Sequence, residues 1–146
     1  MKTGNKIIVT FLLVMLVGCG AKKSVTPDDL MDKEWTLTSC NINGTKIETG
    51  EQPVVLFFAD SVNVGGSSGC NRIIGNYELT NDTLTINIMG TTRMACPDME
   101  FESKYLNMMQ NPMYVRIEND GSKMVLENST TGVDLTYELP TGQQEK

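Results

Sequence analysis

Short runs of alternating apolar and polar residues, separated by turn-forming dipeptides, constrain the fold of this chain more than any other feature. Residues 83–88 and 133–139 alternate strictly, which is typical of strands that face a core on one side and water on the other. Residues 54–58 are wholly apolar and end at the turn-forming Ala59-Asp60. The remaining strand-like runs are 35–37, 61–64, 73–79, 114–117 and 123–126. The pattern predicts a mainly β fold.

One segment has helical spacing instead. Asp98 can cap a helix whose first turn holds Glu100 and Glu102, both favourable beside the positive end of a helix. Asn111-Pro112 ends the helix. The apolar residues that share one helix face are Phe101, Tyr105, Leu106 and Met109. Together the segments predict a small antiparallel β-barrel-like or strongly curved sheet of about eight strands, with one packed α-helix.

The amino end has the pattern of an export signal. Two lysines precede an apolar run of eleven residues, 7–17, which is followed by Gly18-Cys19. An apolar middle of about 7–15 residues is typical of a signal peptide, whereas a helix that spans a bilayer takes about 20 residues. The sequence Leu16-Val17-Gly18-Cys19 resembles the lipobox of bacterial lipoproteins. That resemblance implies a lipid on Cys19; ordinary cleavage that leaves a free thiol is the alternative.

Lipidation would fix the location of the chain. Two or more acyl chains on Cys19 would anchor it stably, so we expect a membrane partner and a place in the bacterial cell envelope. Position two of the mature chain is Gly20 rather than aspartate, which by resemblance to Gram-negative lipoproteins favours the outer membrane. We expect a signal peptide at 1–18, a lipidated tether at 19–30, a folded domain at 31–140 and a disordered tail at 141–146.

The composition of the mature chain argues against several functions. Loss of Lys2 and Lys6 leaves ten basic and eighteen acidic side chains. This balance argues against nucleic acid, because nucleic-acid binding requires clustered lysine and arginine. The chain has no histidine, and therefore lacks the usual proton shuttle at neutral pH and the commonest metal ligand. We expect a protein that is not an enzyme and has no cofactor or metal site.

Three cysteines remain after Cys19: Cys40, Cys70 and Cys96. No two of them have the Cys-x-x-Cys spacing typical of zinc sites. An envelope compartment favours disulfides, so we expect one bridge and one odd thiol.

Several motifs together resemble the META domain of HslJ-type envelope lipoproteins. They are Trp35-x-Leu37, Asn43-Gly44, Gly69-Cys70-Asn71, Gly75-x-Tyr77, Leu84-x-Ile86, Thr92-Arg93-Met94-Ala95-Cys96 and Glu100. The resemblance runs from about residue 34 to residue 139, and Gly-Cys-Asn followed by Met-Ala-Cys is its most specific part. It implies a compact β-barrel-like fold and a link to envelope stress, without an established enzymatic activity. It also implies structural roles for Trp35, Gly69, Asn71, Gly75, Tyr77, Thr92, Arg93 and Glu100.

The two motif cysteines of the family correspond to Cys70 and Cys96. A bond between them would close a loop of 26 residues, which stabilises by about 3.5 kcal/mol in the loop-entropy model. Two buried thiols that never meet are the alternative. The family pattern gives Cys40 no partner, and we expect a half-buried, passive thiol there. Arg93 is expected to hold a carboxylate, with Glu100 as the candidate.

Two other patterns are given structural interpretations. The stretch Gly65-Gly66-Ser67-Ser68-Gly69 lacks the following helix and lysine of phosphate-binding loops, so a turn or bulge is favoured. Asp60-Ser61-Val62 and Asp82-Thr83-Leu84 look like an O-glycan acceptor triplet, although both also fit the starts of turns or strands.

Three functions are compatible with these features. The first is a lipid-anchored, non-enzymatic envelope module that supports stress tolerance or integrity by binding an envelope component. The second is a lipocalin-like carrier of a small apolar ligand in the barrel interior. The third is a thiol-dependent redox protein. A filled interior favours the first, a large internal cavity favours the second, and a reactive Cys40 favours the third.

Overall fold

A computed structural model describes residues 23–97 and 99–142 of the chain. The expected signal peptide, Cys19, Asp98 and the last four residues lie outside this part. In chain order the elements are α1 (Pro27–Leu30), β1 (Glu34–Ile42), β2 (Thr45–Lys46), β3 (Val54–Phe58), β4 (Asn63–Ser68), β5 (Arg72–Thr80), β6 (Thr83–Thr91), α2 (Met99–Met109), β7 (Met113–Glu118), the short 3-10 turn η1 (Asn119–Gly121), β8 (Lys123–Asn128) and β9 (Val133–Glu138).

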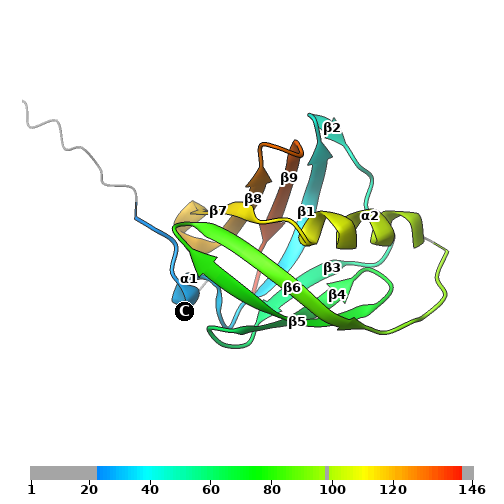
Figure 1. Ribbon diagram of the computed structural model, residues 1–146, viewed down its shortest axis with the longest axis horizontal. Coiled ribbons are helices and arrows are strands. Elements are labelled where there is room, and N and C mark those ends of the chain that lie inside the picture. Colours follow the sequence, from blue (N-terminus) through cyan, green and yellow to red (C-terminus); the bar gives the residue numbers. More distant parts are fainter. Residues whose placement is uncertain (1–22, 98, 143–146) are drawn as a thin grey trace, which may run out of the picture.

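Nine strands form one antiparallel sheet in the order β2-β1-β3-β4-β5-β6-β7-β8-β9, and β1 also pairs with β9. This second pairing closes eight strands into a ring, to which the two-residue β2 is added as an arm of β1. β1 can close the ring because residues 34–36 pair with β3 and residues 36–42 pair with β9. The expected mainly β, barrel-like antiparallel sheet with one packed helix is confirmed (Figure 1).

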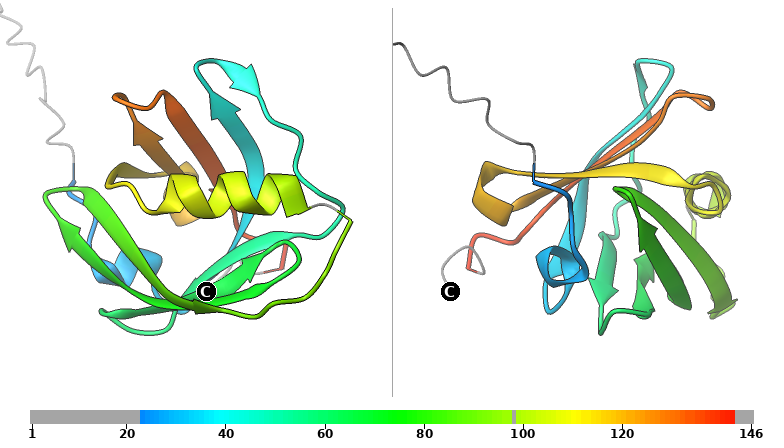
Figure 2. Two further views of the ribbon diagram at one scale, coloured as in Figure 1. Left: turned by 45° about the vertical axis from the view of Figure 1, so that its right-hand side comes forward. Right: turned by 60° about the vertical axis from the view of Figure 1, so that its left-hand side comes forward.

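The ring has its shortest ladder between β6 and β7, which share two residue pairs, Thr83–Tyr114 and Leu84–Met113. Beyond these pairs the strands diverge, and α2 lies across the opening between them (Figures 1 and 2). The helix covers the opening because one face of it is apolar. Its buried apolar residues are Phe101, Tyr105, Met108 and Met109.

Large side chains fill the interior of the ring. Those with no exposed surface include Trp35, Phe58, Tyr105 and Tyr137. The hydroxyls of Tyr105 and Tyr137 lie 2.9 Å apart, and the Tyr137 O–H donates to Met109 Sδ at 3.7 Å. Burial raises the pKa of both tyrosines. This packing favours a structural barrel over a carrier, because carriers need an interior volume of about 300–1,000 Å³.

The folded part begins before the expected boundary at residue 31. Leu30, the last residue of α1, is fully buried. The indole Nε1–H of Trp35 donates to the Leu30 carbonyl at 2.9 Å, and the Val25 N–H donates to Asp82 Oδ1 at 2.7 Å. The expected tether, residues 19–30, therefore includes a segment that packs on the barrel.

The glycine-rich stretch is a strand over most of its length. Residues 65–68 belong to β4 and pair with β3 on one side and with β5 on the other. The expected turn begins at Gly69, and the positive φ that this interpretation required occurs at Gly66, +151°, and at Gly69, +104°. Local composition favoured a turn, but two flanking ladders hold this backbone extended.

Candidate functional site

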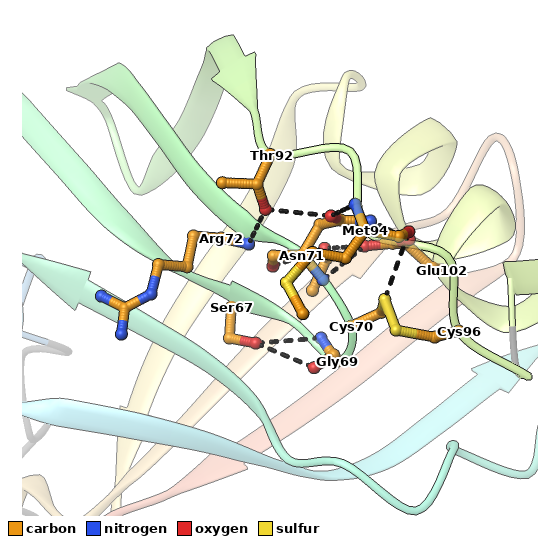
Figure 3. Close-up of a disulfide and its surroundings, with 10 residues drawn as sticks. Ser67, Gly69, Cys70, Asn71, Arg72, Thr92, Met94, Cys96 and Glu102 are labelled. Atoms are coloured by element: carbon orange, nitrogen blue, oxygen red, sulfur yellow. Dashed lines mark hydrogen bonds between the residues drawn. A yellow bond between two sulfur atoms is a disulfide. The ribbon is translucent and has the colours of Figure 1, made fainter.

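Cys70 and Cys96 form a disulfide, with their Cα atoms 6.0 Å apart (Figure 3). Cys70 lies between β4 and β5, and Cys96 lies between β6 and α2. The bond therefore ties the glycine-rich strand to the segment that leads into the helix. The pairing implied by the family resemblance is confirmed.

Asn71, the residue after Cys70, uses both ends of its buried side-chain amide. Its Oδ1 accepts the Thr92 hydroxyl at 2.9 Å and the Met94 N–H at 2.7 Å. Its Nδ2 donates to Glu102 Oε2 at 2.8 Å, and its backbone N–H donates to Glu102 Oε1 at 3.0 Å. The Thr92 hydroxyl oxygen also accepts the Arg72 N–H at 3.0 Å. One side chain thus joins β5, the segment after β6, and α2 (Figure 3).

Glu102 is a carboxylate with 4% exposure, and it was not among the site residues expected from the sequence. Besides Asn71, it accepts the hydroxyl of fully buried Ser68. A buried carboxylate destabilises the fold unless several hydrogen-bond donors satisfy it. Here the donors are Ser68 and Asn71, at the two ends of residues 68–71, which we call the cysteine turn. Its position in the helix could have revealed it. Glu102 lies three residues before Tyr105 and seven before Met109, so all three share the buried face.

Two glycines of the family pattern are required by geometry. The positive φ of Gly69 is a conformation that other residues rarely adopt. At Gly75, in the middle of β5, a Cβ atom would overlap the Asn87 carbonyl oxygen of β6. The register between β5 and β6 shifts there, between Ile74 and Gly75. Gly69 therefore places Cys70 and Asn71, and Gly75 permits the close approach of β6.

A surface hollow of about 600 Å³ opens beside the disulfide. Its apolar lining includes the disulfide, Met94, Pro97 and Phe101, and Glu51 and Gln52 contribute polar groups. Buried Ser68 reaches its wall and connects it to Glu102. The hollow is large enough for a small ligand or a few side chains of a partner.

Three other motif residues have structural contacts. The ring of Trp35 is fully buried, and Lys33 Nζ lies 5.5 Å from its centroid. The Tyr77 hydroxyl donates to the Asp60 carbonyl at 2.8 Å, and its ring packs edge-on against Phe58 with centroids 4.9 Å apart. Thr92 belongs to the Asn71 network.

The expected pairing of Arg93 with Glu100 was wrong. Glu100 is exposed and pairs with Lys104 Nζ at 2.7 Å, one helical turn further on. Arg93 is also exposed, and across residues 23–97 and 99–142 no ion pair of its guanidinium is found. In this helix it is Glu102 that stabilises the structure. Its hydrogen-bond partners are neutral donors and not an arginine.

Cys40 is the free cysteine of the described chain, and it is fully rather than half buried. Burial, and then the charge of Asp134, raises the pKa of its thiol. A thiol reacts as the thiolate, so this environment makes Cys40 unreactive.

The triplets that resemble glycan acceptors both lie at turns. Asp60 Oδ1 accepts the N–H groups of Val62 and Asn63 at 2.8 and 2.7 Å, and these bonds lower the pKa of Asp60 together with the Asn63 side chain, whose bond has the largest effect. Asp82 has a positive φ of 58° between β5 and β6. Turn geometry accounts for both aspartates, and glycosylation stays a prediction.

In the part of the chain that the structure covers, no three cysteine or carboxylate side chains gather in a way that could hold a metal ion. Within that same part, no helix has the length and apolar character needed to cross a membrane. The geometry offers an apolar hollow with polar groups, above a rigid hydrogen-bonded base. Such a site suits binding.

The comparisons with known proteins agree with the motifs. The META domain profile matches residues 28–138, most of the chain. The chain belongs to the META domain family. It is similar to the heat shock protein HslJ of Escherichia coli (strain K12), with 30% identity over 127 residues, which cover 86% of this chain and 78% of HslJ.

Solved structures show the same fold for this META domain. It resembles the NMR structure of a protein from Burkholderia xenovorans with a TM-score of 0.65 and 29% identity, over 83% of this chain and 92% of the other. A second NMR structure matches with a TM-score of 0.58 and 28% identity, over 79% of this chain and 95% of the other. The family resemblance inferred from the motifs is confirmed.

Proposed function

We propose that this META domain protein is a lipid-anchored module of the bacterial cell envelope, at the outer membrane, and that it supports envelope integrity under stress by binding an envelope component without catalysis. The observation that carries the anchor is Cys19 at the close of the apolar run 7–17. The similarity to a relative named as a heat shock protein supports the link to stress.

The state of the polar and thiol groups supports binding rather than chemistry. Cys70 and Cys96 are bonded to each other, and Cys40 is buried with a raised pKa. The carboxylate of Glu102 is buried and engaged by Ser68 and Asn71. The thiols and the buried carboxylate beside the hollow therefore have structural roles, and the remaining acid of its lining, Glu51, is exposed to solvent. The filled interior likewise argues against a carrier.

Removal of the lipid site tests the anchor. In cells, we expect the native chain to fractionate with membranes, and Cys19→Ser to prevent lipidation and maturation at residue 19. The Cys40→Ala variant is the matched control, because it removes a thiol outside the lipobox and should fractionate like the native chain. Equal fractionation and equal mass of the native chain and Cys19→Ser would refute the anchor.

Photo-crosslinking in intact cells tests the binding role of the hollow. A photoreactive amino acid in place of Glu51, which is exposed and lines the hollow, should give a defined crosslinked product. The same group in place of Asn107, exposed on the outer side of α2, is the control. The same products at both positions, or none at position 51, would contradict binding through the hollow.

A further inference from the structure

The outer face of strands β3–β6, together with the segment that follows β6, carries large apolar residues that nothing in the described chain covers. Phe57, Ile74, Met89 and Met94 have exposed fractions of 41%, 63%, 61% and 58%. We call this surface the apolar face, and define it by these four residues. Phe57 on β3, Gly65 on β4, Ile74 on β5 and Gly90 on β6 lie in one register line across the sheet. Met89 precedes Gly90 on β6, and its Sδ accepts Asn76 Nδ2 at 3.8 Å; Asn76 lies two positions from Ile74 on β5 and faces the same side of the sheet.

The apolar face adjoins the disulfide hollow. A depression of about 560 Å³ lies over the glycines of β4, and its lining includes Phe57, Arg72, Ile74 and Met94. Met94 and Cys70 line both hollows. The depression exists because Gly65 has no side chain between Phe57 and Ile74.

Charge is sparse on this face. Among the twenty-nine residues of β3–β6, two are charged, Arg72 and Glu78. Arg93 is exposed next to Met94, and Glu34 borders the depression on β1. The balance is close to neutral, in a mature chain with an excess of acidic side chains. Strands β7–β9, by comparison, carry two basic and four acidic residues, so an anionic lipid layer would repel the apolar face less than that side.

The tether leads to the hairpin that carries the face. The Val25 N–H is bonded to Asp82 Oδ1, in the turn that joins β5 to β6. Five residues lie between Cys19 and Val25, so an acyl group on Cys19 would be about 20 Å from that turn even with the chain fully extended. Ile74 and Met89 lie on the two strands of the same hairpin. A lipid anchor on Cys19 thus holds the turn of this hairpin near the bilayer, and Ile74 and Met89, about 25 Å further along the strands, reach the bilayer when the hairpin lies flat on its surface.

From the register line, the missing charge and the tether attachment, we infer that the apolar face is the membrane-contacting surface of the protein. Phe57, Ile74, Met89 and Met94 enter the boundary between headgroups and acyl chains, and the guanidinium of Arg72 binds lipid phosphate. The inference rests on the proposed lipid anchor and deepens it. It fixes which side of the barrel lies on the bilayer and leaves the β8–β9 turn pointing away.

Quenching of tryptophan by brominated lipid tests this orientation in the lipidated full chain. Ile74→Trp and Phe57→Trp place reporters on the apolar face. Thr131→Trp is the matched control; it lies in the exposed β8–β9 turn, which is on the opposite side of the molecule from β3–β6 in Figure 1 and in both panels of Figure 2. The native Trp35 is fully buried, and the unsubstituted chain gives its contribution. The vesicles contain phosphatidylcholine and phosphatidylglycerol, with and without bromine on the acyl chains.

We expect bromine to lower the added emission of both reporters roughly two-fold or more, because amphipathic surfaces enter about 5–10 Å into this boundary. The Thr131→Trp emission should not change. The inference would be overturned, with the anchor left intact, if vesicle-bound protein showed no quenching of the two reporters, or if position 131 were quenched equally. It would also be overturned if the reporters became shielded from solvent only as the protein density on the vesicle rose, without quenching, because this would indicate that a second copy covers the face. A chain that does not float with vesicles would refute the anchor itself.

Discussion

Two branched apolar residues that face outward on opposite sides of the barrel, Ile74 and Val125, have very different surroundings. On β5, Ile74 lies between Gly65 and Gly90 and is 63% exposed. On β8, Val125 lies between Arg116 and Thr136 and is only 4% exposed. Glycine neighbours leave an apolar side chain uncovered, whereas long or branched neighbours cover it.

The two sides differ in charge as well. Six of the eighteen residues in β7–β9 are charged, against two of twenty-nine in β3–β6. Arg116 pairs with Glu127 at 2.6 Å, and Lys123 pairs with Glu118 at 3.1 Å. On the β7–β9 side, these paired side chains therefore cover the outer surface of the strands. The β3–β6 side has little side-chain packing outside, and is stabilised at one end by the disulfide and the Glu102 network.

The largest expected effect comes from removing the disulfide on the glycine-rich side. The double variant Cys70→Ala, Cys96→Ala should lower the free energy of unfolding by about 3.5 kcal/mol in denaturant titrations. Hydrogen exchange should rise most in the β4–β5 turn and in residues 92–97, and least in β7–β9. A loss below about 1 kcal/mol, or exchange that rises evenly on both sides, would break the comparison.

The next effect concerns the tyrosine pair that joins α2 to β9 between the two sides. Burial raises the folded-state pKa of Tyr105 and Tyr137 above the ordinary value of 10. Their contribution to stability is therefore complete below pH 10 and is lost as pH rises above it. Each tyrosine should remove up to about 1.4 kcal/mol per pH unit above about pH 10. Denaturant titrations at several alkaline pH values measure the slope.

The Tyr137→Phe variant is the control for this pH dependence. It should unfold more easily at neutral pH, because it breaks the bond to Tyr105, and it should lose less stability between pH 10 and 11 than the native chain. An unchanged slope in the variant would contradict the assignment to the tyrosines.

A smaller loss of unfolding free energy is expected for Glu102→Gln, and Glu100→Gln in the same helix is its control. Glu102→Gln should cost about 2 kcal/mol, because it weakens charge-assisted bonds and turns an amide N–H₂ toward buried donors. Glu100→Gln, which affects an exposed pair with Lys104, should cost about 0.5 kcal/mol or less. Equal effects, measured by thermal and denaturant unfolding, would mean that the Glu102 network does not stabilise this end of the barrel.

The smallest expected effect is the most informative about the apolar face. Ile74→Thr should change stability by at most about 0.5 kcal/mol, because its side chain is already exposed. Val125→Thr keeps the shape but buries a hydroxyl, and should cost about 1–2 kcal/mol. Denaturant titrations compare the two variants directly. A large loss for Ile74→Thr would show that the apolar face serves folding, and would weaken the case for a docking surface.

The strands were predicted well because each of them carries its own alternating or wholly apolar residue pattern. Residues 83–88 alternate on one strand, and Phe101, Tyr105 and Met109 mark one helix face, so local periodicity was sufficient. It could not predict that β1 pairs with both β3 and β9, since that closure depends on contacts distant in sequence.

The candidate site was predicted only in part, because its remaining residues are selected by contacts between segments that are distant in sequence. The motif located the disulfide and Asn71, whereas the choice of Glu102 over Glu100 depends on which side of α2 meets the cysteine turn. Periodicity placed both acids in the first turn, and only tertiary packing distinguished the buried one. The apolar residues Ile74 and Met89 were likewise indistinguishable from core residues until the sheet was closed.

The most direct test of the whole account is the intact mass of the mature protein, purified from its native membrane in detergent. We expect a chain that begins at Cys19 and carries diacylglycerol, with a further acyl group on its new amine. A water-soluble chain that still begins at Met1 and carries no acyl group would contradict both the envelope anchor and the orientation of the barrel on the bilayer.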